Sequence, residues 1–252
     1  MRSVLAALLL VPVIATADDG FVRVPQGTLV SVLKYEDNLA PQNIDSFDIM
    51  RAPVTNAQFL AFVRTHPQWQ RGQVSPVFAE PGRYLSHWQG PLQLGPGVLP
   101  EQPVVQVSWF AANAYCEAIG ARLPVWNEWE YVAAADTLRR DARQDPAWRE
   151  GVLAWYSSPS NQPLAAVAQR PANVYGVYDS HGLVWEWTQD FSAMLVSSDN
   201  RTQSDPDKAQ FCGAGALSIK DKEDYAVMMR VAMLSSLQAL NSTANLGFRC
   251  AR

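Results

Sequence analysis

The sequence predicts an α+β domain that is rich in loops, and three observations lead to this fold class. Short windows with apolar residues at helical spacing are mixed with short windows of strand-like alternation. Seventeen prolines, fourteen glycines and nine tryptophans among 252 residues are typical of a fold with many turns. No internal repeat, low-complexity tract or linker divides the chain. We therefore expect one domain over residues 18–252, built from short helices and strands.

The first 17 residues have the layout of a secretory signal peptide. Arg2 supplies a positive charge, residues 4–14 form a short apolar run, and Ala15-Thr16-Ala17 is a small-x-small cleavage site. The run is too short to cross a bilayer, and no later stretch is long and apolar enough. We predict cleavage after Ala17, no membrane span in the exported chain, and a periplasmic location in a Gram-negative source.

The N-terminal part of the domain predicts strands followed by a helix. Residues 21–32 alternate in a way that favours a strand pair turning at Pro25-Gln26-Gly27, and residues 47–49 are strand-like. Thr55 is a good N-cap for a helix that runs through His66, because apolar residues recur on one face of it.

Pro67 ends this helix, and residues 68–103 show no sustained period. We interpret them as a long ordered loop. Ser108 is predicted to cap a second helix that runs through Ile119 and stops at Gly120, in the usual position for a C-terminal glycine.

A third helix is predicted over residues 128–135, with Asn127 as its cap. Residues 140–172 read as irregular chain. The C-terminal part reads as short strands alternating with loops, and it ends in a strand-like run over residues 247–251.

Charge and motifs exclude several classes of function. The formal net charge is −4 and the basic residues are scattered, so no nucleic-acid surface is expected. His66, His87 and His181 have no metal-ligand spacing, and the chain lacks a phosphate-binding loop and a nucleophile elbow. Neither nucleotide binding nor serine hydrolysis is therefore indicated.

Four segments, in a fixed order, carry a family resemblance. They are MRAPVTNAQFLAFV (50–63), VSWFAANAYCEAIGARLPVWNEWEYVAAA (107–135), NVYGVYDSHGLVWEWTQDF (173–191) and NLGFRCA (245–251). In this order they resemble the sulfatase-modifying-factor family, whose founding activity is the formylglycine-generating enzyme. The resemblance covers nearly the whole chain after the signal peptide, and it implies a C-type-lectin-like α+β fold.

The third segment implies a calcium site. In the family, calcium is held by an Asn or Asp side chain, two main-chain carbonyls and the glutamate of the W-E-W run. At the matching positions this chain has Asp179, Gly182, Val184 and Glu186, which supply the oxygen ligands that calcium prefers. The alternative is that Glu186 only pairs with an arginine and that both neighbouring tryptophans are core residues.

The cysteines carry a second implication of the resemblance. The family joins the cysteine of its A-Y-C helix to that of its final strand, which here are Cys116 and Cys250, 134 positions apart. Two buried free thiols are the alternative, but an exported protein favours the disulfide. Cys212 is then the one unpaired thiol.

The copper site of the formylglycine-generating enzymes has no counterpart in this chain. In those enzymes two thiolates, five residues apart, hold copper(I), an ion that soft sulfur ligands suit. Aligning Arg230-Val231-Ala232 on the segment that follows the thiolates puts Asp221 and Ala226 at their positions. Cys212 lies upstream and is a weak candidate for a redox role. The histidine cluster of the related iron enzymes is also missing.

Two classes of function remain open from the sequence. The first is a calcium-stabilised accessory, not an enzyme, that binds, matures or regulates another periplasmic or membrane-anchored protein. Exported relatives of the TagR-like and NirV-like kinds, from type VI secretion and from metalloenzyme maturation, suggest such a role. The alternative is a periplasmic oxidoreductase of the PvdO type that acts on a siderophore precursor or peptide. Four tryptophans are either anchors for a partner or half-buried packing: Trp69, Trp88, Trp148 and Trp155.

Overall fold

The computed structural model describes residues 20–31, 41–159, 162–192 and 225–252. The predicted signal peptide, Cys212 and Asp221 lie outside these residues. The elements in chain order are β1 (Phe21–Val24), β2 (Gly27–Leu29), β3 (Gln42–Ile44), β4 (Phe47–Met50), α1 (Asn56–Thr65), the short 3-10 helix η1 (Pro67–Trp69), α2 (Trp109–Ala118), α3 (Trp126–Ala133), α4 (Pro146–Tyr156), β5 (Trp185–Glu186), α6 (Tyr225–Ser235) and β6 (Leu246–Gly247).

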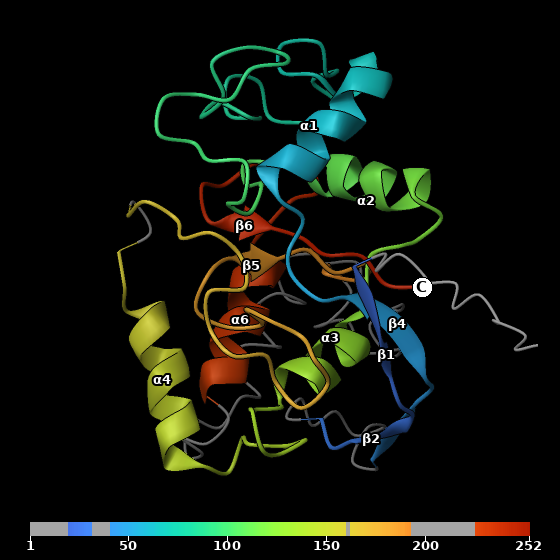
Figure 1. The fold of residues 1–252 in the computed structure, drawn as a ribbon, viewed down its shortest axis with the longest axis vertical. Coiled ribbons are helices and arrows are strands. Elements are labelled where there is room, and N and C mark those ends of the chain that lie inside the picture. The colour runs from blue at the N-terminus through green and yellow to red at the C-terminus, as the bar shows by residue number, and fades with distance from the viewer. Residues whose placement is uncertain (1–19, 32–40, 160–161, 193–224) are drawn as a thin grey trace, which may run out of the picture.

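The elements surround a short central pair of strands, β5 and β6 (Figure 1). Helices α1 and α2 and the irregular chain between them form one end of the molecule. Helices α3 and α6 lie on the other side of the central pair, α4 flanks them, and β1 and β4 lie on the opposite flank. The structure is therefore a loop-rich mixture of short helices and strands, as the sequence predicts. No helix of the described residues is long and apolar enough to cross a membrane.

The strand pairing differs from the predicted hairpin over residues 21–32. Both strands form, but β1 pairs antiparallel with β4, from Phe21 opposite Met50 to Val24 opposite Phe47, and β2 pairs with β3. The prediction was wrong because local alternation identifies strands but not their partners. The inward side chains of β1 and β4 bury against α3, a contact that only the folded chain provides.

The ends of α1 and α2 confirm the predicted caps. The Thr55 hydroxyl accepts the Gln58 N–H at 3.3 Å, and the Gln58 side chain accepts the Thr55 N–H at 2.8 Å, a reciprocal capping box. The Ser108 hydroxyl accepts the Ala111 N–H at 3.2 Å. Gly120 follows α2 with φ of +71°, the conformation in which glycine is favoured.

The start of α3 corrects the prediction that Asn127 is its cap. The helix begins at Trp126, and the Trp126 N–H donates to the Asp190 carboxylate at 2.7 Å. Glu128 accepts the N–H of Val125 at 3.0 Å. A side chain 64 positions away therefore takes the capping role, which a local sequence pattern does not reveal.

Two helices correct the interpretation of segments that the sequence left irregular or strand-like. Helix α4 lies inside residues 140–172, with Asp145 accepting the Ala147 N–H and Pro146 in the first turn. Only Val152 of this helix is fully buried, so little of its surface belongs to the core. Helix α6 lies where the C-terminal part was expected to hold only strands and loops. The final strand is also shorter than predicted, with β6 at Leu246–Gly247 and a separate bridge at Ala251.

The 68–103 segment is an ordered loop, as predicted, apart from the end of η1. Hydrogen bonds tie this loop to α1 and η1. The Trp88 indole donates to Asn56 at 3.1 Å, and the Tyr84 hydroxyl donates to the Trp69 carbonyl at 2.9 Å. Trp88 is 1% exposed, so it is packing and not a partner anchor. Trp69, Trp148 and Trp155 are half-buried.

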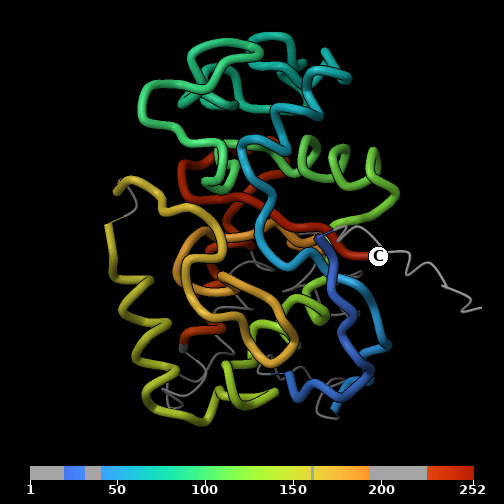
Figure 2. Tube along the Cα trace, in the orientation of Figure 1, coloured from blue at the N-terminus to red at the C-terminus, as the bar shows by residue number. Residues whose placement is uncertain are grey.

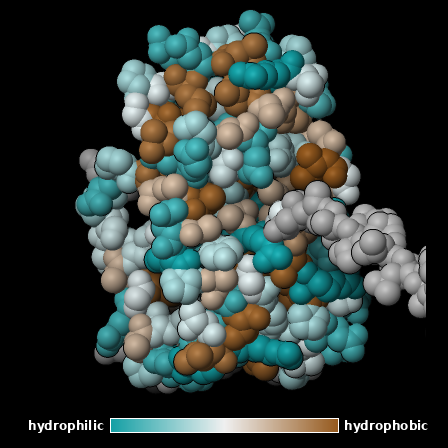
Figure 3. Space-filling view, in the orientation of Figure 1, coloured by the Kyte–Doolittle hydropathy of each residue, from teal (hydrophilic) through white to brown (hydrophobic). Residues whose placement is uncertain are grey.

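Several large apolar side chains on this loop are exposed. Val77, Phe78, Leu92 and Leu99 have exposed fractions of 70%, 44%, 45% and 52%. Figure 3 shows apolar atoms gathered over the end of the molecule where the loop lies. Phe78 also packs against Trp69, with ring centroids 5.9 Å apart, so part of this surface supports the loop itself.

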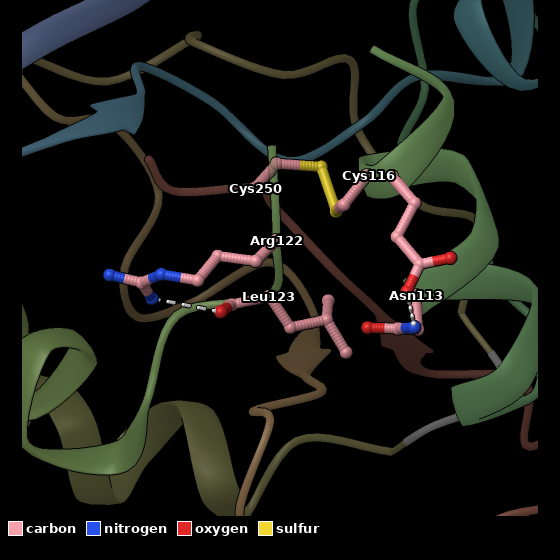
Figure 4. The surroundings of a disulfide bond; sticks show 6 residues. Asn113, Cys116, Arg122, Leu123 and Cys250 are labelled. Atoms are coloured by element: carbon pink, nitrogen blue, oxygen red, sulfur yellow. Dashed lines mark hydrogen bonds between the residues drawn. A yellow bond between two sulfur atoms is a disulfide. The ribbon is translucent and has the colours of Figure 1, made fainter. Parts of the chain in front are cut away.

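The predicted disulfide is confirmed. Cys116 on α2 is bonded to Cys250 near the C-terminus, with Cα atoms 5.5 Å apart (Figure 4). Both cysteines are fully buried. Beside them, Arg122 and Ala251 exchange backbone hydrogen bonds of 2.9 and 2.7 Å. The bond therefore fixes the last residues of the chain between α2 and the segment that leads to α3.

Removing the disulfide should lower the free energy of unfolding by about 3–5 kcal/mol, because the bond closes a long loop in the unfolded chain. Denaturant unfolding of the Cys116→Ala/Cys250→Ala variant measures the loss. Reductant should bring the wild-type protein to the same midpoint and leave the variant unchanged. Equal midpoints for oxidised wild type and variant would contradict the expectation.

His87 should make stability depend on pH. Burial, the largest cause, lowers the pKa of His87 below 6.5, although a hydrogen bond to Gln106 opposes the effect. The unfolded chain therefore binds more protons below pH 6.5, and stability falls as the pH is lowered through that value. His87→Asn, which keeps a donor for Gln106, should flatten the dependence of the unfolding free energy on pH between 7 and 5. An unchanged slope would rule out His87 as its source.

Candidate functional site

The segment from Tyr178 to Trp187 lies beside β6 at the centre of the fold. β5 pairs parallel with β6, Trp185 opposite Leu246, and Figure 2 shows these two stretches of chain side by side. Alternation along extended chain places Glu186 on the opposite face from Trp185 and Trp187. Trp187 is fully buried and donates its indole N–H to the Val107 carbonyl at 3.0 Å. Trp185 is only half-buried, so the two tryptophans have different surroundings.

Glu186 is buried and paired with an arginine. Its Oε2 accepts the Arg249 Nε–H and the Trp129 indole N–H, both at 2.7 Å, and its Oε1 accepts Arg249 Nη2–H at 2.7 Å. Neither the Glu186 nor the Arg249 side chain is more than 1% exposed. The arginine pairing considered as an alternative for Glu186 is therefore present. The contacts use three of the four lone-pair positions of the carboxylate.

Asp179 is held in a turn at the edge of the same segment. It has a φ of +55°, a left-handed conformation that aspartate tolerates. Its Oδ2 accepts the Ala168 N–H at 2.6 Å, and its Oδ1 lies 3.6 Å from Nη2 of Arg170. Its side chain is 3% exposed. Gly182 has a φ of +87°, a conformation in which glycine is favoured.

The oxygens of the predicted calcium site are compatible with a cation in their chemistry. Within the described part of the chain, the carbonyls of Gly182 and Val184 accept no hydrogen bond, and Glu186 Oε1 keeps one free lone pair. The opposing feature is Arg170, whose guanidinium already faces Asp179. Among the described residues no group of three or more His, Cys, Asp and Glu side chains is placed to hold a metal. Calcium at these positions stays a prediction.

A cleft of about 430 Å³ opens on the Trp185 side of the segment. Its wall is aromatic: the rings of Tyr156 and Trp185 stack with centroids 4.8 Å apart, and Trp155 lies 5.2 Å from Trp185. Polar groups on the wall come from Gln162, Asn245 and Ser158. The described residues that line the cleft include no carboxylate, imidazole, guanidinium, amine or thiol. Such a lining suits stacking and amide hydrogen bonds.

A buried polar layer adjoins the cleft. Arg230 on α6 donates to Glu130 on α3 at 2.7 Å, and both side chains are at most 3% exposed. The guanidinium carbon of Arg230 lies 3.9 Å from the ring centre of Trp129. Several buried atoms of the layer have no hydrogen-bond partner: Glu130 Oε1, Arg230 Nε and Nη1, the Tyr156 hydroxyl and His181 Nδ1. Unpaired buried polar atoms of this number are commonly satisfied by internal water.

The pKa values in this layer follow from burial. Burial lowers the pKa of His181 to about 3, and the Arg230 charge adds to the effect, so the imidazole is neutral near pH 7. Burial also raises the pKa of Tyr156. At neutral pH both groups are therefore uncharged hydrogen-bonding groups beside the Arg230–Glu130 pair.

Of the two predicted thiolate positions only the second, Ala226, is among the described residues, and it holds an apolar side chain. Ala226 lies on α6 and is 3% exposed. Asp221 and Cys212 lie outside the described residues, so the structure leaves the candidate role of Cys212 untested.

The comparisons with known proteins agree with this architecture. The family model described as a sulfatase-modifying factor enzyme 1-like domain matches residues 10–252. The chain belongs to this family. A sulfatase-modifying-factor-like domain thus accounts for the loop-rich fold, and the four sequence segments that resembled the family are parts of it.

Relatives of this chain are named for different activities. The chain is 31% identical over 244 residues to the formylglycine-generating enzyme of Streptomyces coelicolor, covering 81% of this chain and 77% of the relative. It is 34% identical over 181 residues to hercynine oxygenase of Mycolicibacterium smegmatis, where it spans 60% of this chain and only 40% of the relative. Among solved structures, PvdO from Pseudomonas aeruginosa aligns with a TM-score of 0.48 at 20% identity, over 92% of this chain and 93% of that one. Because the two sequence relatives are named for different activities, family membership alone does not decide the activity.

Several site residues were not identified from the sequence. Arg249 and Glu130 lie within the family segments, in the G-F-R-C and W-E-Y runs, but their partners are 63 and 100 positions away. Tyr156 was missed with helix α4. Arg170 lies in a stretch with no local pattern, so no sequence signal marked it.

Breaking the buried ion pair between Glu130 and Arg230 should strongly destabilise the protein. Glu130→Gln leaves Arg230 buried without a counter-charge and should lower the free energy of unfolding by about 3 kcal/mol or more. Denaturant unfolding measures the loss. As a matched surface control, Arg23→Ala removes an exposed pair with Asp48, in which the arginine is 63% exposed, and should cost under about 1 kcal/mol.

The double variant Glu130→Leu/Arg230→Met replaces the pair with apolar side chains. It should lose less stability than the sum of its two single variants, because neither charge is left alone. Strict additivity would show that the two side chains act independently.

Proposed function

We propose that this sulfatase-modifying-factor-like domain is an exported accessory that binds, matures or regulates another envelope protein. The proposal includes removal of residues 1–17, a periplasmic location and kinship with the TagR-like, NirV-like and PvdO-like group. It also includes a C-type-lectin-like topology and structural calcium held by Asp179, Gly182, Val184 and Glu186. In this role the protein recognises its partner, and the fold is a rigid support for the loops that make the contact.

The observation that carries the proposal is the composition of the aromatic cleft. Trp155, Tyr156 and Trp185 provide rigid, stackable surface, and the described wall adds only amide and hydroxyl groups. Aromatic side chains with adjacent hydrogen-bonding groups are typical of binding hot spots. Acid–base or nucleophilic catalysis needs a titratable group within reach of the substrate, and the described wall supplies no carboxylate, imidazole or thiol. Ala226 at a thiolate position points the same way.

Photo-crosslinking in cells of the source organism tests the proposal. A photoreactive amino acid at Gln162, on the cleft wall, should trap one predominant protein, identifiable by mass spectrometry. The same probe at Leu138, which is 84% exposed and does not line the cleft, should not trap it. Trp155→Ala, added to the Gln162 probe, should abolish the adduct while circular dichroism shows an intact fold.

An adduct from both positions, or one that survives Trp155→Ala, would contradict binding through the cleft. An oxidoreductase acting on a siderophore precursor or peptide gives a different outcome. Oxygen consumption with a thiol peptide or a siderophore precursor, lost in Cys212→Ser or accompanied by tight copper(I) binding, would replace the accessory role.

A further inference from the structure

We propose that Arg170 is a built-in competitor for the cation site predicted at Asp179, Gly182, Val184 and Glu186. In the described structure its guanidinium supplies the positive charge beside Asp179, and a bound cation must displace it. The inference rests on the calcium site included in the proposed function. It adds a residue of this chain that sets the affinity of that site.

The contacts of Arg170 place its guanidinium against the loop that carries the ligands. Nη2 donates to the His181 carbonyl at 2.5 Å and lies 3.6 Å from Asp179 Oδ1. A Cβ atom added to Gly182 would lie 2.2 Å from Nη1 and 2.8 Å from Cζ, so the guanidinium lies directly on the glycine. One side chain thus covers two of the four residues expected to hold the cation.

Arg170 is the movable arginine of the site, and Arg249 is the fixed one. Arg249 is 1% exposed and donates to Glu186, to the Tyr178 carbonyl and to the carbonyls of Met50 and Arg51. Arg170 is 54% exposed, and its distance to Asp179 is longer than a hydrogen bond. Moving Arg170 into solvent therefore breaks few contacts, whereas moving Arg249 leaves a buried carboxylate unpaired.

The charges of the site explain why the two cations exclude each other. Asp179 and Glu186 balance Arg170 and Arg249, so the group is neutral as it stands. Adding a divalent cation makes it strongly positive unless Arg170 leaves. Repulsion between charges a few ångströms apart is large in a poorly solvated site. Removing Arg170 also leaves Asp179 without a counter-charge, which favours a cation from solution.

Calcium titration of the purified protein tests the inference. Isothermal titration calorimetry should show that Arg170→Ala binds calcium about ten-fold or more tightly than wild type. The calcium-dependent rise in Tm should be larger in the variant for the same reason. Arg83→Ala is the matched control, because Arg83 is 66% exposed and pairs with Glu80 away from the site, and its affinity should equal that of wild type. Arg170→Ala/Asp179→Asn should lose the gain, which locates binding at this loop.

The outcomes separate this inference from the proposed function. Equal affinity of wild type and Arg170→Ala overturns competition by Arg170 but leaves the calcium site in place. A gain in calcium affinity that persists in Arg170→Ala/Asp179→Asn also overturns competition by Arg170, because calcium then binds elsewhere. Absence of calcium binding in all variants overturns both Arg170 competition and the calcium site. Crosslinking at Gln162 reports on partner binding independently of all three results.

Discussion

The buried pair between Glu186 and Arg249 is the interaction on which the rest of the structure depends. Arg249 directs all of its guanidinium nitrogens to acceptors: Nε and Nη2 to Glu186, Nη2 also to the Tyr178 carbonyl, and Nη1 to the carbonyls of Met50 and Arg51. Glu186 in turn accepts the Trp129 indole N–H. Two charges at most 1% exposed are tolerated only when they are satisfied in this way. The pair therefore holds β4, α3, the 178–187 segment and the C-terminal segment in one arrangement.

The covalent bond adjoining this pair serves the same region. Cys250 follows Arg249 directly, and its disulfide joins it to Cys116 on α2 (Figure 4). The disulfide restricts the unfolded chain, whereas the ion pair orders the folded one. Together they fix the position of Trp185, which is next to Glu186 and forms part of the cleft wall. The wall of the aromatic cleft is thus next to a part of the chain that is held both by a disulfide and by a buried ion pair.

The W-E-W run consequently has three separate roles. Trp187 is a fully buried core residue, Glu186 pairs with Arg249 in the C-terminal segment, and Trp185 lines the aromatic cleft. Ala226, which lies where the sequence resemblance places a thiolate, is a buried apolar residue of α6. Membership of the family therefore does not by itself fix the chemistry of a site.

The sequence by itself determined the family, the α+β class, the caps of α1 and α2, and the pairing of Cys116 with Cys250. These features depend on local patterns or on family segments that are contiguous in the chain. Only the tertiary structure decided which strands pair, that α4 and α6 are helices, that Asp190 caps α3, and that Arg170 lies on Gly182. The strand pairing, the Asp190 cap and the position of Arg170 depend on contacts between residues that are distant in sequence. Local propensity has no information about a partner that the folded chain brings from elsewhere.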